Sequence, residues 1–216
     1  IEVLSPPGKM LFPGPPHWFG PKAGNKAFMV PREVTVRLTI PEDMPPGPIG
    51  WRAVNANGVS PPLELLVTDS HDVIEEESRT SSGAPQQLPT LPCTLFGRLK
   101  QKEEVDQYRF VSPVDGLITC SVNSHGFGFG LHAAVLIHDE AGNLVSDTAD
   151  TEGQGLQTTL AVKSGAEYLV TLSDIDYRGN RSMVYRLSFE TTPRVIATVP
   201  AAGQRGATQK ITFIGY

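Results

Sequence analysis

The sequence lacks long apolar runs, and this lack excludes one large class of protein. No stretch of its 216 residues approaches the roughly 20 consecutive apolar residues that a membrane-spanning helix needs. The chain also lacks an initial methionine and the charged-then-apolar segment of an export signal. We expect both ends, at Ile1 and Tyr216, to be cuts through a longer polypeptide, so the missing signal does not identify the compartment.

Positive charge is scarce as well. Lys and Arg number 18 against 23 Asp and Glu, which gives a formal net charge of -5. No run of basic residues provides the electrostatic footprint that nucleic acid or an anionic membrane requires. Aromatic residues make up 7% of the chain and do not alternate with basic ones, so stacking on single strands is excluded too. We therefore expect no nucleic-acid partner.

Cysteine is limited to two positions, Cys93 and Cys120. Ile118, Cys120 and Val122 share one face of an alternating run, so a buried thiol that acts as a small hydrophobic group is the favoured interpretation. A disulfide between the two cysteines is the alternative, because an exported protein would permit it. A zinc site is excluded because no further ligands lie at close spacing.

Turn-forming residues, in contrast, are abundant, with 21 Gly and 19 Pro. The hydrophobic fraction is 39%, the charged fraction is 19%, and strong helix formers do not cluster. This composition predicts many short strands joined by tight turns. Alternating runs predict strands at 95–99, 107–111, 117–122, 131–138, 157–162, 168–172 and 185–189. Their spacing predicts an all-β fold, with an antiparallel β-sandwich in this block.

The segments on either side of this block are organised differently. Turn formers dominate residues 1–30, and further strands are predicted at 34–40, 51–55, 63–67, 195–200 and 211–214. The segment from Asp69 to Pro92 is acidic and polar without an apolar period, which is typical of a linker. We therefore predict four parts: a smaller β unit at 1–68, a linker at 69–90, the sandwich at 91–191 and the start of a further β domain at 192–216.

Several motifs recur in a fixed order along the block from 91 to 189. They are a strand with a central glycine at 95–99, an acid-x-Asp-x-aromatic-x-Phe signature at 104–110, a hairpin at 135–144 and a closing segment at 165–187. Together they resemble the bacterial pre-peptidase C-terminal (PPC) domain family. The resemblance implies a β-sandwich of jelly-roll type. It also implies an accessory, non-enzymatic module that is secreted, periplasmic or on the cell surface.

The flanking segments carry a second resemblance. Residues 46–60 are similar to the end of an immunoglobulin-like IPT/TIG domain, and residues 193–206 are similar to the start of another. The complete order is similar to that of large exported multidomain proteins of planctomycete-type bacteria. It implies that the partners are other domains of the same polypeptide, with an extracellular polymer or protein in addition.

No hydrolytic centre can be assembled from the sequence. Ser124 and His125 are adjacent, but they lie in a glycine-rich loop and not in the strand-turn-helix setting of a nucleophile elbow. His132 and His138 share a strand face about 20 Å apart, which is too far for a shared metal. We therefore predict that the chain is not an enzyme.

Calcium is the one cofactor for which carboxylates are available. The segment 174–180 resembles a calcium loop, but Arg178 occupies a ligand position, so a β-turn is favoured there. In calcium-binding relatives of the PPC family, a Glu-x-Glu-x-Asn stretch meets acids at the Asp-x-aromatic signature. That pattern places Glu75 and Glu77 opposite Asp106 as calcium ligands, with Glu103 and Glu104 close by in sequence.

A departure from the family pattern opposes this calcium site. Arg79 stands where the family has Asn, and a cation there competes with a metal. A solvated acidic linker is therefore the expectation for 75–77. Asp106 is expected to accept backbone hydrogen bonds from the turn before its strand.

Three functional hypotheses remain open. The first is a structural or binding module that spaces or anchors other domains of an exported protein. The second is a carbohydrate- or protein-polymer-binding domain that serves a linked enzyme, for which Trp18, Tyr108 and Tyr177 are the available aromatic side chains. The third is a part of an enzyme whose catalytic domain lies outside this chain.

Overall fold

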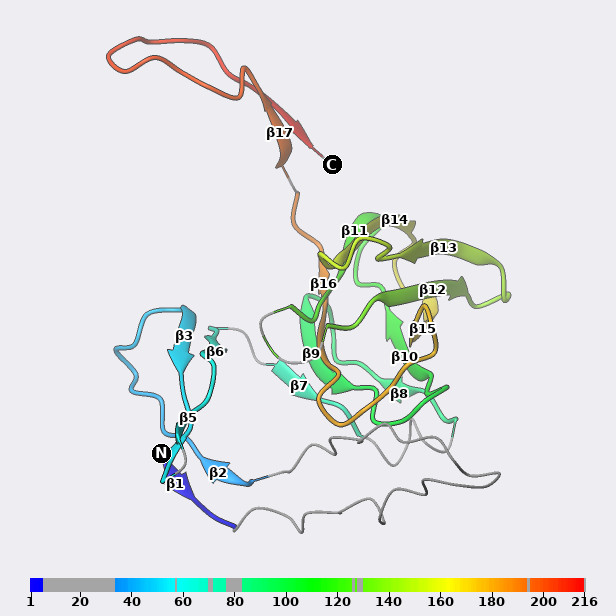
Figure 1. Cartoon of the computed structure of the whole chain (residues 1–216). Helices are drawn as coiled ribbons and strands as arrows, with labels where there is room; N and C mark the ends of the chain where they lie inside the picture. Colours follow the sequence, from blue (N-terminus) through cyan, green and yellow to red (C-terminus); the bar gives the residue numbers. More distant parts are fainter. Residues whose placement is uncertain are drawn as a thin grey trace, which may run out of the picture. The chain divides into compact units, whose positions relative to one another are not determined.

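The computed structural model in Figure 1 describes residues 1–5, 34–56, 58–69, 72–76, 83–125, 127, 130–193 and 195–215. These residues form strands, turns and irregular segments, and none of them is helical. Within them there is accordingly no helix long and apolar enough to cross a membrane. The chain divides into two compact units, Ile1–Gly47 and Pro48–Tyr216. The flanking parts of the four-part division expected from the sequence stay predictions.

Two five-stranded sheets make up the sandwich (Figure 1). Its strands are β7 (Asp72–Ile74), β8 (Gln86–Gln87), β9 (Cys93–Arg98), β10 (Asp106–Val111), β11 (Gly116–Asn123), β12 (Ala133–Asp139), β13 (Leu144–Ala149), β14 (Leu156–Val162), β15 (Glu167–Asp174) and β16 (Val184–Glu190). One sheet has the order β13-β12-β15-β10-β8, and the other has the order β14-β11-β16-β9-β7. From β9 to β16 every pairing is antiparallel, and consecutive strands alternate between the sheets except at the β12–β13 hairpin. This order is that of a jelly roll, and it confirms the predicted fold class.

The core lies between the two sheets because each strand alternates. In β15 the inward residues Tyr168, Val170 and Leu172 are buried, and the residues between them are half-buried. β10 contributes Phe110, which stacks on Tyr168 at 5.2 Å between ring centroids and packs against Phe189 of β16 at 4.8 Å. Period-two burial on both sheets therefore produces one continuous apolar layer.

The segment expected to be a linker at 69–90 differs from that expectation. Residues Asp72–Ile74 form β7, which pairs in parallel with β9, and Gln86–Gln87 form β8, which pairs in parallel with β10. Leu88 is buried in the core. The described parts of this segment therefore complete one edge of each sheet. The sandwich begins at Asp72 and not at 91.

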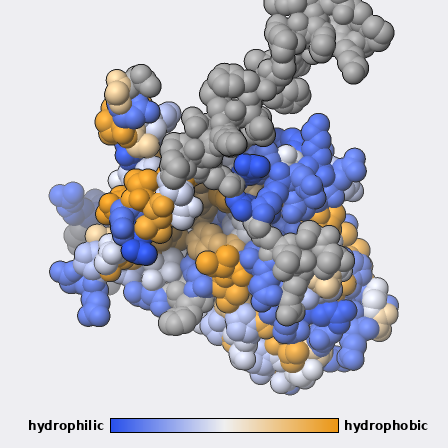
Figure 2. Space-filling model, turned by 90° about the horizontal axis from the view of Figure 1, so that it is seen from below, coloured by the Kyte–Doolittle hydropathy of each residue, from blue (hydrophilic) through white to orange (hydrophobic). Residues whose placement is uncertain are grey.

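The flanking strands form separate two-stranded sheets. They pair β1 (Glu2–Val3) with β2 (Val36–Arg37), β3 (Gly47–Trp51) with β6 (Leu63–Val67), β4 (Val54–Asn55) with β5 (Gly58–Val59), and β17 (Val195–Val199) with β18 (Thr212–Gly215). Many of their large apolar side chains are exposed, including Val36, Val59 and Phe213. The run expected as a strand at 34–40 pairs over two residues alone, because a lone ribbon buries little apolar surface. Figure 2 shows hydrophobic groups on one face of the molecule, scattered among hydrophilic residues.

The register of β16 settles the state of the cysteines. Phe189 pairs with Cys93 of β9 on one side and with Cys120 of β11 on the other. Two strand spacings place the Cα atoms about 9–10 Å apart, beyond the roughly 4.4–6.8 Å of a disulfide. Both thiols are free and buried, and burial raises their pKa values, that of Cys93 to about 11. The interpretation as buried thiols is confirmed, and the disulfide alternative is wrong.

Candidate functional site

Glu75 and Asp106 lie near each other in the sandwich, at the end of its first edge strand. Glu75 directly follows β7 of one sheet, and Asp106 begins β10 of the other. Asp106 is fully buried and Glu75 is 7% exposed. The two carboxyl groups are close enough for the negative charge of Glu75 to raise the pKa of Asp106. Glu75 and Asp106 therefore lie near each other, and their role as calcium ligands stays a prediction.

Two tyrosines that the sequence did not single out for this site complete the cluster. The Tyr185 hydroxyl of β16 donates to Oδ2 of Asp106 at 2.6 Å. Because that proton is committed to Asp106, the adjacent Tyr108 hydroxyl donates to the Tyr185 oxygen. Both tyrosines are fully buried. Oδ1 of Asp106 is buried with no hydrogen-bond donor from the protein.

This environment raises the pKa of Asp106 to about 8. Burial is the largest cause, the negative charge of Glu75 is the next, and Glu104 adds a smaller repulsion. The hydrogen bond from Tyr185 acts in the opposite direction, because it stabilises the carboxylate. At neutral pH, without a cation, Asp106 is therefore mostly protonated.

Glu75 is fixed in place and is not part of a solvated linker. Its Oε2 accepts the backbone N–H of Arg98 at 2.9 Å, and its own N–H donates to the carbonyl of Phe96 at 2.8 Å. The side chain of Gln86 strengthens the same edge, because it accepts from the N–H of Glu76 and donates to the carbonyl of Ile74. The expectation of a plain solvated segment is therefore wrong for Glu75.

Two of the three acids predicted as calcium ligands are among the described residues. Glu75 and Asp106 contribute adjoining carboxylates and one buried oxygen without a donor, which suits a hard cation. Glu77 lies outside the described residues. Within the described ranges, no group of three acids, histidines or cysteines is arranged to hold a metal.

The acid that accepts a backbone hydrogen bond from the turn before β10 is not the one expected from the sequence. Asp106 binds a tyrosine hydroxyl, and no backbone donor to it is present among the described residues. Glu104 instead accepts the N–H of Gln101 at 2.8 Å and closes the turn before β10. Glu103 is exposed, in the left-handed region with φ of 63°. The turn-closing acid therefore lies two residues before the predicted one.

Asp174 is a second buried acid, and it organises the loop after β15. Its carboxylate accepts the backbone N–H groups of His132, Asp176 and Arg178. The Arg178 guanidinium adds two bonds, of 2.9 and 2.8 Å. Burial alone would raise the pKa of Asp174, but these donors hold it below its ordinary value. The segment is a turn built on an ion pair, as favoured over a calcium loop.

The serine and histidines considered for catalysis have structural surroundings. The Ser124 hydroxyl donates to the carbonyl of Leu131 and accepts its N–H, and Ser124 is 2% exposed. His125 follows in the loop, where its N–H donates to Asn123. His132 and His138 are half-buried, and His138 lies on β12, an interior strand of its sheet and not an edge.

The aromatic candidates for polymer binding differ in how far they are buried. Tyr108 points into the core, so it is not a surface residue. Tyr177 is 59% exposed at the tip of the loop between β15 and β16. Trp18 lies outside the described residues.

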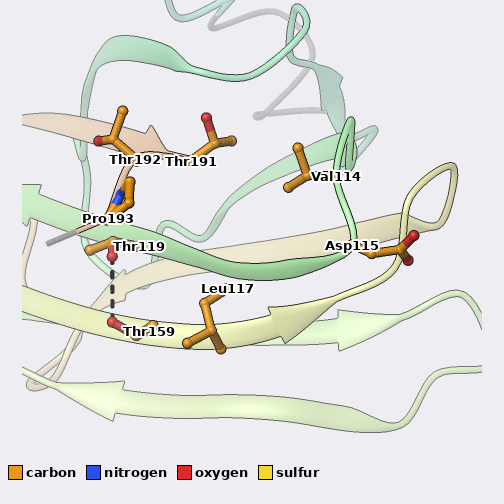
Figure 3. Close-up of a pocket in the computed structure, with 8 residues that line it drawn as sticks. All are labelled: Val114, Asp115, Leu117, Thr119, Thr159, Thr191, Thr192 and Pro193. Atoms are coloured by element: carbon orange, nitrogen blue, oxygen red, sulfur yellow. Dashed lines mark hydrogen bonds between the residues drawn. The ribbon is translucent and has the colours of Figure 1, made fainter. Parts of the chain in front are cut away.

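A surface cleft of about 380 Å³ lies at the other end of β16 (Figure 3). Its lining includes four threonines (Thr119, Thr159, Thr191 and Thr192), together with Asp115 and Leu117. The hydroxyls of Thr119 and Thr159 are 3.4 Å apart, and Asp115 accepts the N–H of Ser164. Its lining residues contain no nucleophile with a base. No sequence pattern indicates this cleft, because it depends on the path of the chain after β16.

Comparisons with known proteins give structural likenesses alone. No family model and no curated protein matches the chain. The PPC domain of collagenase from Bacillus anthracis is 19% identical, with a TM-score of 0.38, and the match covers 57% of this chain and 99% of that one. PliG of Aeromonas hydrophila, a periplasmic inhibitor of g-type lysozyme, is 12% identical with a TM-score of 0.37 and covers 56% of this chain and 98% of its own. CorA of Methylomicrobium album BG8, a surface-associated copper-binding protein, is 5% identical with the same TM-score and coverages.

Proposed function

We propose that this chain is a non-catalytic accessory module of an exported multidomain bacterial protein. In this role the sandwich spaces or anchors neighbouring domains, or binds an extracellular polymer or protein. The order of PPC-like motifs in the sequence supports this role. So does the way in which the sandwich uses its reactive side chains.

The observation that carries the proposal is that groups capable of chemistry are committed to the fold. The Ser124 hydroxyl makes two bonds to the backbone of Leu131, so its oxygen is not aligned with an activating base. Asp174 accepts five hydrogen bonds within its own loop and from the start of β12. Asp106 is fully buried, and its carboxyl group accepts a hydrogen bond from Tyr185. Each group stabilises a connection between strands.

A panel of peptidase, esterase and glycosidase substrates tests this proposal on the purified chain. We expect no turnover above buffer with the wild type, with Ser124→Ala or with His125→Ala. Turnover that persists through repurification and disappears in either variant would contradict the non-catalytic role.

We also propose that 1–68 and 192–216 belong to IPT/TIG-like domains that flank the sandwich. The sequence similarity at 46–60 and 193–206 supports this assignment. The exposed apolar side chains of β2 and β17 support it as well, because a complete Ig-like sandwich buries such residues. An extended gene product that carries both domains should bury Val36 and Val199, as hydrogen exchange of their strands would show.

Calcium binding is a second proposal, and the buried Oδ1 of Asp106 favours it. Glu75, Asp106 and, by the sequence pattern, Glu77 would hold the ion. A bound divalent cation would neutralise the adjoining carboxylates and so tie the residues after β7 to the start of β10. Arg79 opposes this charge balance.

Melting temperatures with millimolar calcium and with chelator test this second proposal. A ligand that binds the folded state alone raises the melting temperature, so we expect a higher value with calcium for the wild type. Glu75→Gln should abolish the difference. Glu152→Gln, at an exposed acid in the β13–β14 loop, should retain it. Equal melting temperatures of the wild type in both buffers would contradict calcium binding.

A further inference from the structure

Two residues of the described chain hold a backbone conformation that L-residues rarely adopt. They are Glu103, with φ of 63°, and Tyr177, with φ of 52°. Tyrosine has little reason to occupy the left-handed region, which glycine and asparagine adopt far more readily. Strained residues of this kind persist where the surrounding structure fixes them, and they concentrate at binding sites.

The two strained residues contact each other across neighbouring loops. The N–H of Glu103 donates to the carbonyl of Tyr177 at 3.0 Å. Nearby, the N–H of Asn180 donates to the carbonyl of Leu99 at 2.9 Å. Gly179 packs so closely that a Cβ there would lie 1.9 Å from the carbonyl oxygen of Gln101. These contacts hold the β9–β10 loop against the β15–β16 loop, so a change in the backbone of one loop would disturb the other.

Asp174 fixes the same loop from beneath. Its carbonyl accepts the N–H of Tyr177 at 2.9 Å, while its buried carboxylate holds the residues on either side. The consequence is that Tyr177 presents its ring to solvent, with 59% of the residue exposed, on a loop that is already ordered. Preorganisation of this kind lowers the entropic cost of binding.

One arginine and two aspartates lie beside the ring, so the local charge is small. The guanidinium of Arg178 pairs with Asp174 at 2.8 Å and approaches Asp176 at 3.8 Å. Arg178 and Asp176 remain 41% and 66% exposed in their side chains. The ring is therefore flanked by strong donors and acceptors whose charges sum to −1, which repels a polyanion and is too small to attract a polycation strongly.

We propose that Tyr177 is the stacking residue of a binding site for neutral polysaccharide. A sugar ring presents an apolar C–H face to the negative face of an aromatic ring, and its hydroxyls bond to a carboxylate and a guanidinium. Asp176 and Arg178 provide those groups on either side of Tyr177. The inference rests on the proposed accessory function and names the ligand class and the site through which the sandwich would serve it.

Affinity electrophoresis of the purified chain in native gels tests the site. The gels contain hydroxyethylcellulose or galactomannan as neutral polysaccharides, dextran sulfate as a polyanion, or gelatin as a protein polymer. We expect retardation by at least one neutral polysaccharide and not by dextran sulfate or gelatin. Tyr177→Phe keeps the ring and should retain binding, and Tyr177→Gly should weaken it by about tenfold or more.

Glu103→Gly is the matched control. Glycine relieves the same left-handed strain on the opposing loop, and the backbone bond between the two loops remains. We expect both glycine variants to melt at or above the wild-type temperature, and Glu103→Gly to bind as the wild type does. Binding that survives in Tyr177→Gly, or a wild type that neither neutral polysaccharide retards, would overturn the proposal. Retardation by gelatin alone would also overturn it, while the accessory function would stand; enzymatic turnover, in contrast, would contradict the accessory function itself.

Discussion

The sandwich and the flanking strands are built from similar alternating sequences, yet they differ in what those sequences bury. Phe110 in β10 is fully buried between two sheets, whereas Phe213 in β18 is 67% exposed. The run at 34–40 alternates as strictly as β15 does, but Val36 remains 48% exposed. Alternation thus sets the local conformation of a strand, and stability comes from a second layer that covers its apolar face.

Truncation of the two phenylalanines should show the largest difference in stability between the two regions. Phe110→Ala removes a ring that contacts Tyr168 and Phe189, and we expect it to lower the free energy of unfolding by about 3–5 kcal/mol. Phe213→Ala should change it by less than about 0.5 kcal/mol, because its ring is already in water. Urea unfolding followed by circular dichroism measures both values. Similar losses for the two variants would contradict the contrast.

The pH dependence of stability should be confined to the sandwich, and its sign is fixed by Asp106. The folded pKa of about 8 lies above the ordinary value of 3.8, so the folded state binds more protons between these values. The contribution of Asp106 to the free energy of unfolding is therefore largest at low pH. It falls as the pH rises from the ordinary pKa to the folded pKa of about 8, by at most about 1.4 kcal/mol per pH unit.

Urea unfolding between pH 5 and pH 8 in calcium-free buffer measures this slope. Asp106→Asn removes the titrating group and should flatten the profile relative to the wild type. Asp174 is the contrasting buried acid, because its lowered pKa makes its contribution disappear in acid and not in base. A wild-type profile parallel to that of Asp106→Asn would refute the assignment.

Two glycines allow the effect of one added methyl group to be compared between the sandwich and a flanking strand. A Cβ at Gly97 in β9 would lie 2.5 Å from the ring of Tyr185, the residue that bonds Asp106. Gly97→Ala should cost about 1–3 kcal/mol of unfolding free energy, because the buried ring cannot move away freely. Gly50→Ala in β3 meets no atom within 4 Å and should have almost no effect. Thermal melts of the two variants give the difference, and a Gly97→Ala melt equal to that of the wild type would contradict it.

Surface ion pairs should show the smallest effect in both regions. Arg109 pairs with Glu167 at 2.5 Å in the sandwich, and Arg37 pairs with Glu2 at 2.8 Å in the N-terminal flank. Both pairs are substantially exposed, so water and salt weaken them. Arg109→Gln and Arg37→Gln should each lower the melting temperature slightly in low salt and not at all in 1 M salt, since the Debye length is then about 3 Å. A large loss in high salt would indicate another role for the side chain.

Sequence patterns predicted the strands that carry the core of the sandwich and missed its short or polar edge strands. The long runs at 107–111 and 168–172 appear as β10 and β15, because each buries every second residue. β13 was not predicted as a strand, since Leu144–Ala149 is polar and largely exposed on an edge. β7 and β8 were read as linker, because strands of two or three residues with Asp72 and Gln86 give no periodic signal.

The candidate site shows the same limit. The resemblance to a family pattern paired Glu75 with Asp106, and in the structure the charge of Glu75 raises the pKa of Asp106. The convergence of Tyr108 and Tyr185 could not be read from spacing. They lie on opposite sheets, and their contact depends on how the two layers face each other. The strain at Tyr177 likewise depends on contact between two loops.

We conclude that Asp72–Glu190 is one folding unit, in which β7, β8 and the buried Glu75 belong to the sandwich. Native-state hydrogen exchange on the whole chain tests it directly. The N–H of Glu75 is bonded to Phe96, and that of Leu88 is bonded to Arg109. We predict that both exchange with free energies close to those of β10 and β15, and far above those of β17. Exchange of Glu75 and Leu88 as fast as that of β17 would show that 72–90 is a linker after all and would contradict the account.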